Sequence, residues 1–137
     1  MPAETLVLIE QAIAGAVTAQ VSGPFAFASV DRVQALALDC TFLYGSAGTT
    51  LKAWVQTSFD GGLSWMDILC FAATTAAKRR LVNLTAAVVT TPATPVDGTT
   101  ADDTAVNGFL GGLFRVKLTT TGTYAGATSI KIVAMAK

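Results

Sequence analysis

Apolar and polar side chains alternate along several stretches of this chain, a pattern typical of β-strands with one buried face. The clearest stretch is Arg32–Tyr44, in which large apolar residues recur at every second position. The predicted core face holds Leu36, Leu38, Cys40, Phe42 and Tyr44. The opposite face holds Ala35, Ala37, Asp39 and Thr41. We therefore expect a strand here that packs one face into a core.

Two further β-patterned runs, Leu51–Ser58 and Ser64–Phe71, flank a short turn that contains Asp60-Gly61-Gly62. Asp-Gly between such runs predicts a hairpin, because glycine takes a positive φ without steric cost. Four residues are expected to build the turn, with the first two accepting amide hydrogen bonds and the last covering the apolar side. They are Ser58, Asp60, Gly62 and Trp65. Gly45–Thr50 reads as a turn that leads into this hairpin, which predicts a three-stranded meander.

The rest of the chain predicts more strands and turns at short spacing. Strands are expected at Thr5–Gln11, Phe25–Val30 and Leu81–Thr90, and a closing hairpin at Leu113–Thr120 and Ser129–Ala136. Ser22-Gly23-Pro24 is expected to form a turn. The spacing of apolar residues in Ile13–Val21 fits either a helix or a strand. Ala72–Arg80 is expected to be a loop or a short helical turn. About seven to eight strands predict an all-β fold, an antiparallel β-sandwich or jelly roll. We expect one domain over residues 1–137, with 1–24 as an N-terminal arm or first strand.

Composition changes this picture by suggesting partners. The 137 residues are 52% hydrophobic and 13% charged, about half the usual share of charge. So much apolar surface indicates that part of it is buried against other subunits. The candidate interface is the apolar N-terminal segment, with Leu6, Val7, Leu8, Ile9, Ile13 and Val17. No apolar run reaches the roughly 18 residues of a membrane helix, so no membrane contact is expected.

The charge and residue types also exclude several function classes. A net formal charge of zero removes the electrostatic footprint of a nucleic-acid binder. The short basic cluster Lys78-Arg79-Arg80 is interpreted as a solvated loop or a salt-bridging contact. Histidine is absent, which removes the commonest general base and metal ligand. Cys40 and Cys70 have no metal-ligand spacing, and we expect free thiols in a protein made in a reducing cytosol.

Acidic residues offer two further candidate sites. The polar loop Thr91–Asn107 carries Asp97, Asp102 and Asp103, which invites a Ca²⁺ hypothesis. Their spacing matches no EF-hand, so a solvated loop or a docking segment is preferred. Asp60 and Asp67 could form a glycosidase pair, but such a pair needs a cleft and one raised pKa, and Asp60 has a better use in the turn. We expect no enzymatic activity, no metal and no cofactor.

Ser58–Trp65 also fits the spacing of an Asp-box, S-x-D-x-G-x-[ST]-W. This hairpin recurs in sialidases and in other β-proteins, where it is usually structural and lies away from the catalytic centre. It occurs once here, without a repeat at propeller-blade spacing, so the structural interpretation is preferred.

Two longer segments, VQTSFDGGLSWMDI and GGLFRVKLTTTGTYAGATSIKI, resemble small β-rich virion proteins of tailed bacteriophages. The resemblance covers Trp54–Phe71 and Gly111–Ile132. It implies an assembly role without catalysis, in a family whose members serve as head decoration (cement), neck and tail components.

The expected function is therefore a capsid decoration protein that bridges major-capsid subunits by burying surface and adding strands at exposed edges. A neck or tail component is the alternative within this class. A carbohydrate-binding module is the alternative of another class, with Trp54, Tyr44 and Tyr124 as its aromatic candidates. The expected partners are the major capsid protein or other virion proteins, and further copies of the chain in a homo-oligomer, with a trimer favoured. The expected location is the virion, assembled in the host cytoplasm.

Overall fold

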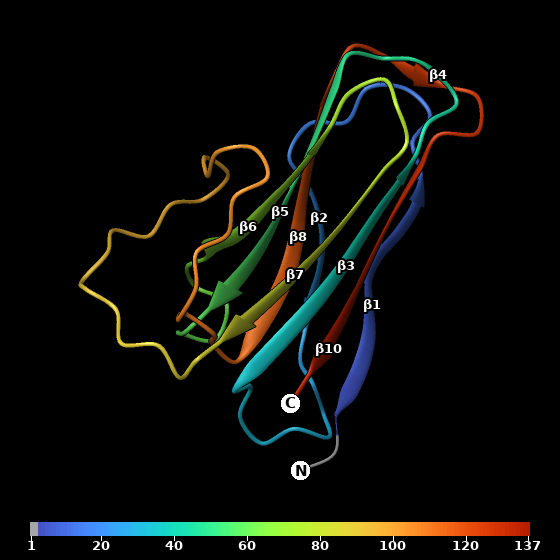
Figure 1. Cartoon of the computed structure of the whole chain (residues 1–137). Helices are drawn as coiled ribbons and strands as arrows, with labels where there is room; N and C mark the ends of the chain where they lie inside the picture. The colour runs from blue at the N-terminus through green and yellow to red at the C-terminus, as the bar shows by residue number, and fades with distance from the viewer. Residues whose placement is uncertain (1–2) are drawn as a thin grey trace.

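The computed structural model describes residues 3–137, and every regular element in that range is a β-strand (Figure 1). The long strands are β1 (Glu4–Ala12), β2 (Gln20–Phe25), β3 (Ala35–Leu43), β5 (Thr50–Ser58), β6 (Met66–Ala73), β7 (Lys78–Thr85), β8 (Leu113–Thr121) and β10 (Ser129–Ala136). Two short strands, β4 (Ser46–Ala47) and β9 (Tyr124–Ala125), complete the set. The predicted all-β class is confirmed. No helix with the length and apolar character needed to cross a bilayer occurs within the described range.

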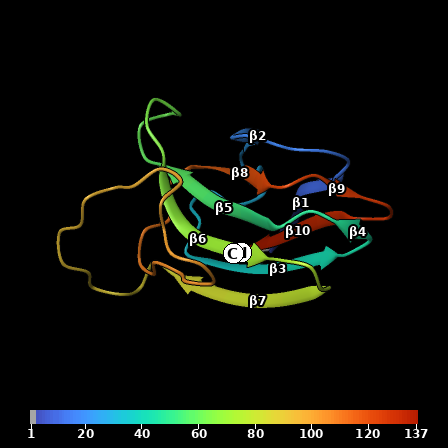
Figure 2. The same cartoon turned by 90° about the horizontal axis from the view of Figure 1, so that it is seen from above.

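The long strands form two antiparallel sheets that lie as two layers (Figure 2). One sheet has the order β1-β10-β3-β7, and the other has the order β2-β8-β5-β6. The small β4–β9 pair lies at one end of the sandwich. A single apolar cluster fills the space between the layers, with buried side chains from seven of the long strands and the half-buried Phe25 of β2 packed against it. The strands form this core because their apolar residues alternate with polar ones and so share one face. On β3 the buried residues are Leu36, Leu38, Cys40 and Phe42.

The predicted meander and the predicted closing hairpin are both wrong. β3 pairs with β10 and β7, whereas β5 pairs with β6 and β8, so Gly45–Thr49 carries the chain from one sheet to the other. β8 and β10 likewise belong to different sheets. Two successive amphipathic strands can bury their apolar faces either side by side or across the core. The local pattern is the same in both cases, and here the chain crosses the core.

Four further features differ from the sequence-based prediction. β2 runs through Ser22-Gly23-Pro24, where a turn was expected, and the strand expected over Phe25–Val30 is absent among the described residues. The pairing of β2 with β8 shifts register between Ser22 and Phe25, and this shift accommodates a proline on an edge strand. The segment before Leu81 contains no helical turn, because β7 begins at Lys78, and β7 ends at Thr85 rather than at Thr90.

The N-terminal segment is a first strand of the sandwich, the second of the two alternatives expected for residues 1–24, of which 1–2 lie outside the described residues. β1 pairs with β10 along its length. A bulge between Val7 and Ile9 turns two successive residues inward, so Leu8 and Ile9 are both buried.

This arrangement corrects most of the candidate interface. Leu8, Ile9 and Ile13 belong to the chain's own core, and Leu6 and Val17 pack half-buried against it. A side chain that fills its own core is not available to a neighbouring subunit. Of the six candidate residues, Val7 alone is largely exposed.

Both cysteines are free and buried, Cys40 on β3 and Cys70 on β6. Burial raises the pKa of Cys40 to about 12 and that of Cys70 to about 11, so neither is a thiolate at neutral pH. We expect the native protein to resist alkylation at both thiols and to react at both after unfolding. Intact mass after iodoacetamide treatment, with and without denaturant, measures this. Native alkylation at the unfolded rate, or a quantitative Cys40–Cys70 bridge, would contradict it.

Candidate functional site

The turn between β5 and β6 is fastened by two side chains, Ser58 and Asp60. The Ser58 hydroxyl donates to Asp60 Oδ1 (2.9 Å) and accepts the N–H of Gly62 (2.9 Å). The Asp60 carboxylate accepts the N–H of Ser64 at Oδ1 (2.9 Å) and the Ser64 hydroxyl at Oδ2. These bonds satisfy amide groups that a bare turn leaves to solvent, and they make the hairpin tip rigid.

Gly62 and Trp65 complete the turn. Gly61 and Gly62 have φ values of 73° and 95°, in the region that side chains with a Cβ rarely adopt. The Trp65 indole N–H donates to the carbonyl of Gly62 (3.2 Å). The Arg115 guanidinium carbon lies 4.4 Å from the centre of the Trp65 ring, a cation–π contact that joins the hairpin to β8.

We expect Gly62→Ala to lower the free energy of unfolding by about 1–2 kcal/mol, because the new Cβ forces an unfavourable backbone conformation. A Cβ at this position meets only ordinary contacts, 3.6 Å from Leu113 and 3.7 Å from Trp65, so the cost is conformational. The matched control is Gly112→Ala, where a Cβ meets open space at an ordinary φ. Urea unfolding of both variants measures the difference, and equal stabilities would contradict the assignment.

Asp60 is expected to make the stability of the protein depend on pH. The Ser64 hydroxyl and amide, followed by the Ser58 hydroxyl, lower the pKa of Asp60 from 3.8 to about 2. A lowered folded-state pKa stabilises the protein above the unfolded value, and this contribution disappears as the pH falls through the folded value. We expect the difference in thermal midpoint between wild type and Asp60→Asn to be constant at neutral pH and to close between about pH 4 and pH 2. A difference that does not change with pH would contradict this.

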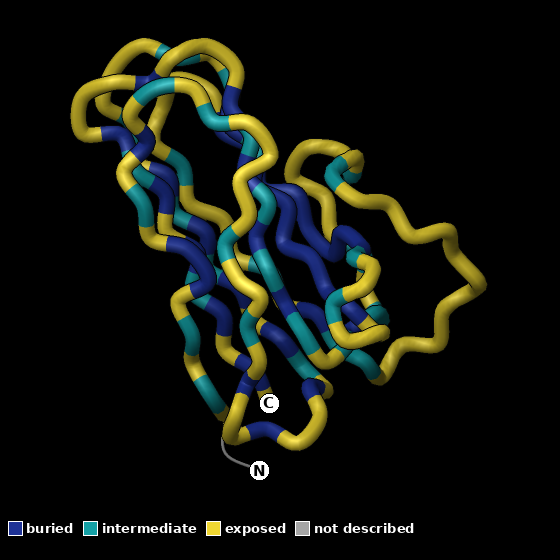
Figure 3. Tube along the Cα trace, turned by 180° about the vertical axis from the view of Figure 1, so that it is seen from behind, coloured by how far each residue is buried: buried dark blue, intermediate teal, exposed yellow. Residues whose placement is uncertain are grey.

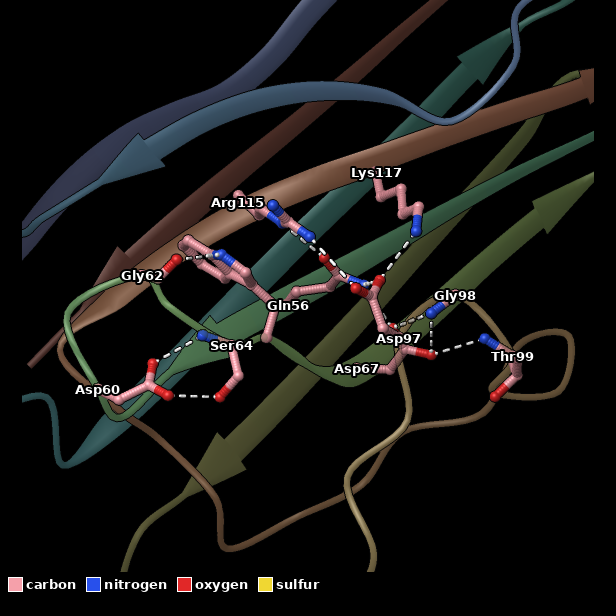
Figure 4. A network of polar contacts seen from close by, with 11 residues as sticks. Gln56, Asp60, Gly62, Ser64, Asp67, Asp97, Gly98, Thr99, Arg115 and Lys117 are labelled. Atoms are coloured by element: carbon pink, nitrogen blue, oxygen red, sulfur yellow. Dashed lines mark hydrogen bonds and ion pairs between the residues drawn. The ribbon is translucent and has the colours of Figure 1, made fainter.

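A second group of polar side chains lies beside the hairpin, on the outer face of the β2-β8-β5-β6 sheet (Figure 4). Gln56 of β5 is fully buried at its centre and donates to Asp67 Oδ1 (2.8 Å) and to Asp97 Oδ1 (2.6 Å). Arg115 of β8 donates to Gln56 Oε1 (2.7 Å), and Lys117 Nζ lies 2.9 Å from Asp97 Oδ1. Partial burial acts to raise the pKa of Asp97, but hydrogen bonds from Gln56 and Lys117 outweigh it and leave the pKa below its ordinary value.

The buried carboxylate of Asp67 binds three successive backbone amides of the long loop. Its oxygens accept the N–H groups of Gly98 (2.8 Å), Thr99 (2.9 Å) and Thr100 (3.0 Å). Such a run of amides forms a concave anion site, and here a side chain of the same chain fills it. Asp67 is fully buried and Asp60 is engaged in the turn, so both members of the suggested glycosidase pair serve as hydrogen-bond acceptors within the fold.

The part of the long loop from Val96 onward packs against the chain's own strand β6, a contact that neither sequence interpretation, a solvated loop or a segment that docks on a partner, included. Main-chain N–H groups of Asp67 and Cys70 on the outer edge of β6 donate to the carbonyls of Val96 and Thr104. The loop also covers the sheet face, where the Trp54 indole N–H donates to the Thr100 carbonyl (3.2 Å). The core buries one side of β6 and the loop covers the other, so all eight of its residues are buried, and this part of the sandwich is dark in Figure 3.

The three carboxylates of this loop bind three separate sets of cations rather than one common site. Asp97 pairs with Lys117 and Arg115, Asp102 pairs with Lys52 (3.0 Å), and Asp103 pairs with Lys78. Within residues 3–137, no group of three acidic, cysteine or histidine side chains has the arrangement of a metal site. The carboxylates therefore hold the loop to the sheet.

The basic cluster is also engaged in ion pairs. Lys78 binds Asp103, and Arg79 binds both oxygens of Asp39 (2.9 and 2.8 Å). The hydrogen bond from Arg79 is the main cause that lowers the pKa of Asp39. Of the two interpretations given from the sequence, the salt-bridging one describes Lys78 and Arg79.

The sequence reasoning missed Gln56, Asp67, Arg115 and Lys117 as one group. A signal was present, since Arg115 and Lys117 alternate with the core residues of β8 and so share its outer face. The pattern does not identify which acidic residue of the long loop lies on that face.

Comparison with known proteins adds no relative, because no family model, no curated protein and no solved structure matches this chain.

Proposed function

We propose that this chain is a non-enzymatic structural protein of a tailed-bacteriophage virion, and more closely a head decoration protein that bridges major-capsid subunits. The resemblance of the hairpin and of the β8–β10 region to such proteins supports the class. The polar clusters support the absence of catalysis, because the carboxylates of Asp60 in the hairpin, of Asp67 on β6 and of Asp97 in the long loop bind groups of the chain itself.

We infer that the sandwich is a jelly roll. When the eight long strands are counted one to eight along the chain, the sheet orders are 1-8-3-6 and 2-7-4-5. This order corresponds to the two interleaved Greek keys of a jelly roll, an architecture used by viral capsid proteins and lectins. The order supports a virion role without distinguishing head, neck and tail.

The observation that carries the proposal is the pair of large apolar side chains at the hairpin tip. Phe59 is 63% exposed and Leu63 is 89% exposed, although the turn that holds them is rigid. A preorganised apolar pair loses little conformational entropy on binding, which is typical of interface anchors. We propose that this tip inserts into a pocket of the major capsid protein.

The test is reconstitution on particles. The wild-type chain, added to heads that lack it, is expected to bind the shell at uniform occupancy in cryo-electron micrographs. The double variant Phe59→Ser/Leu63→Ser is expected to bind at least about tenfold more weakly, since each buried side chain contributes roughly 1.5–3 kcal/mol. Val89→Ser is the control, because Val89 is 99% exposed outside the hairpin.

Three results would change the proposal. Localisation to the neck or tail, with a ring stoichiometry, would replace the decoration role by the alternative within the same class. Unchanged binding by the double variant would remove the hairpin tip from the interface. The absence of the chain from purified particles would overturn the virion role.

The carbohydrate-binding alternative receives no support from its aromatic candidates. Trp54 is buried beneath the long loop, and Tyr124 is buried against Phe42 and Tyr44. Sugar-binding modules of that class require a row of exposed rings, and these three residues do not provide one.

A further inference from the structure

The outer edge of β7 differs from the other three sheet edges of the sandwich. The edge of β6 is covered by the loop through Val96 and Thr104. β1 contains a bulge after Val7, and β2 contains Pro24 and a register shift. Loops, bulges and prolines are the usual devices that stop an edge strand from pairing with another chain. β7 contains no proline, its register with β3 is continuous over all eight residues, and the loop reaches this edge at its last residue, Thr85, through Asn107.

The main-chain groups on this edge can be assigned from the ladder. Ala35 of β3 exchanges both of its hydrogen bonds with Lys137, on the β10 side. Thr85 of β7 lies opposite Ala35, and its N–H donates to the Asn107 side chain rather than to β3. Hydrogen-bonded and non-hydrogen-bonded pairs alternate in an antiparallel ladder. Arg79, Leu81 and Asn83 therefore direct their N–H and C=O groups away from β3, toward the open edge.

We propose that β7 pairs with β7 of a second copy of this chain, antiparallel and two-fold symmetric about Leu81. The pairing places Leu81 opposite Leu81, and Arg79 opposite Asn83 in both directions. The three N–H and three C=O groups of one edge then meet the same groups of the other. The two β1-β10-β3-β7 sheets become one continuous sheet. The Arg80 guanidinium, which donates to the Arg79 carbonyl (3.2 Å) in the single chain, gives up that bond to the partner.

Charge favours this orientation. Basic residues on an edge strand oppose pairing, and β7 carries three. Two of them are already neutralised, Lys78 by Asp103 and Arg79 by Asp39. A parallel arrangement places the basic ends against each other, whereas the antiparallel one places Arg79 opposite an uncharged amide. The net charge of the chain is zero, so two copies do not repel each other over longer distances.

Apolar surface favours the same contact. Leu81 is 69% exposed at the centre of the strand, on the outer sheet face that it shares with Val133 and Met135. Cross-strand apolar pairs stabilise antiparallel sheets, and the two-fold pairing brings the two leucines together. A two-fold contact of this kind closes at two copies rather than the three favoured from the sequence. It does not depend on where the chain acts.

The mass of the full chain in solution tests the pairing. Wild type is expected to sediment at twice the 14.1 kDa chain mass. Leu81→Lys and Leu81→Glu each place like charges opposite one another and are expected to weaken self-association at least about tenfold. An equimolar mixture of the two variants is expected to recover the double mass. Val89→Lys, the same change at an exposed residue outside β7, is the control and is expected to behave as wild type.

Amide exchange gives a second readout that a merely structural role of Leu81 does not reproduce. In the paired protein, the amides of Arg79, Leu81 and Asn83 are expected to exchange slowly, and in Leu81→Lys they are expected to exchange fast. The alternate amides, which bond β3, are expected to remain protected in both. A wild-type chain of single mass, a Leu81→Lys chain that keeps the wild-type mass, or fast exchange at the three amides in wild type would each overturn the pairing.

Discussion

Deletion of residues 1–20 is expected to leave a chain that does not fold. The deletion removes β1 from the edge of its sheet, together with Leu8, Ile9 and Ile13 of the central core. Loss of one such side chain costs about 2–5 kcal/mol, and the total stability of a domain is only about 5–15 kcal/mol. The lost strand would also leave β10 with an unpaired edge. Circular dichroism and dispersion of amide proton resonances measure the outcome.

Two point variants calibrate this result. Leu8→Ala is expected to lower the free energy of unfolding by about 2–5 kcal/mol, because Leu8 is fully buried. Val7→Ala, the neighbouring position on the exposed side of the bulge, is expected to change it by less than about 0.5 kcal/mol. A deletion variant with a cooperative unfolding transition would show that β1 is dispensable and would restore the hypothesis of a detachable arm.

Asp67→Ala is expected to lower the free energy of unfolding by about 3–5 kcal/mol, because several donors around one buried carboxylate lose their acceptor together. These donors are the amides of Gly98, Thr99 and Thr100 and the side chain of Gln56. We also expect the loop over β6 to detach. Urea unfolding measures the first effect, and limited proteolysis between residues 96 and 106 measures the second.

The matched control is Asp102→Ala, in the same loop. Its ion pair with Lys52 is largely exposed to solvent, and such pairs contribute about 0–1 kcal/mol. Equal effects of the two substitutions would mean that the Asp67 amide site does not hold the loop in place.

The sequence predicted those parts of the fold that depend on residues close together in the chain. Alternation identified the inward face of β3, and Asp60-Gly61-Gly62 identified the β5–β6 hairpin, because both depend on residues close in the chain. The pairing of β1 with β10 depends on residues more than a hundred positions apart. No local rule determines such a partner, and so the meander and the closing hairpin were predicted where the chain changes sheets.

The candidate site divides in the same way. The bonds of Ser58 and Asp60 lie within six residues of one another and follow from the turn sequence. The Asp67 amide site joins β6 to a loop about thirty residues later. The candidate interface at the N-terminus was wrong for Leu8, Ile9 and Ile13 for a different reason. Low charge indicates that some apolar surface meets a partner, but composition does not identify which residues form that surface.

The pairing of β1 with β10 also determines the order in which the protein is completed on the ribosome. β5 and β6 are adjacent in sequence and can pair soon after they emerge, whereas β1 has no partner in its sheet except β10. At about 5–20 residues per second, β1 waits roughly 6–23 s for β10 to be synthesised. During that time Leu8 and Ile9 lack the core that buries them, so the nascent chain presents an apolar strand to chaperones. Closure of this sheet therefore has to follow the synthesis of β10, and its timing is set by the length of the chain between β1 and β10.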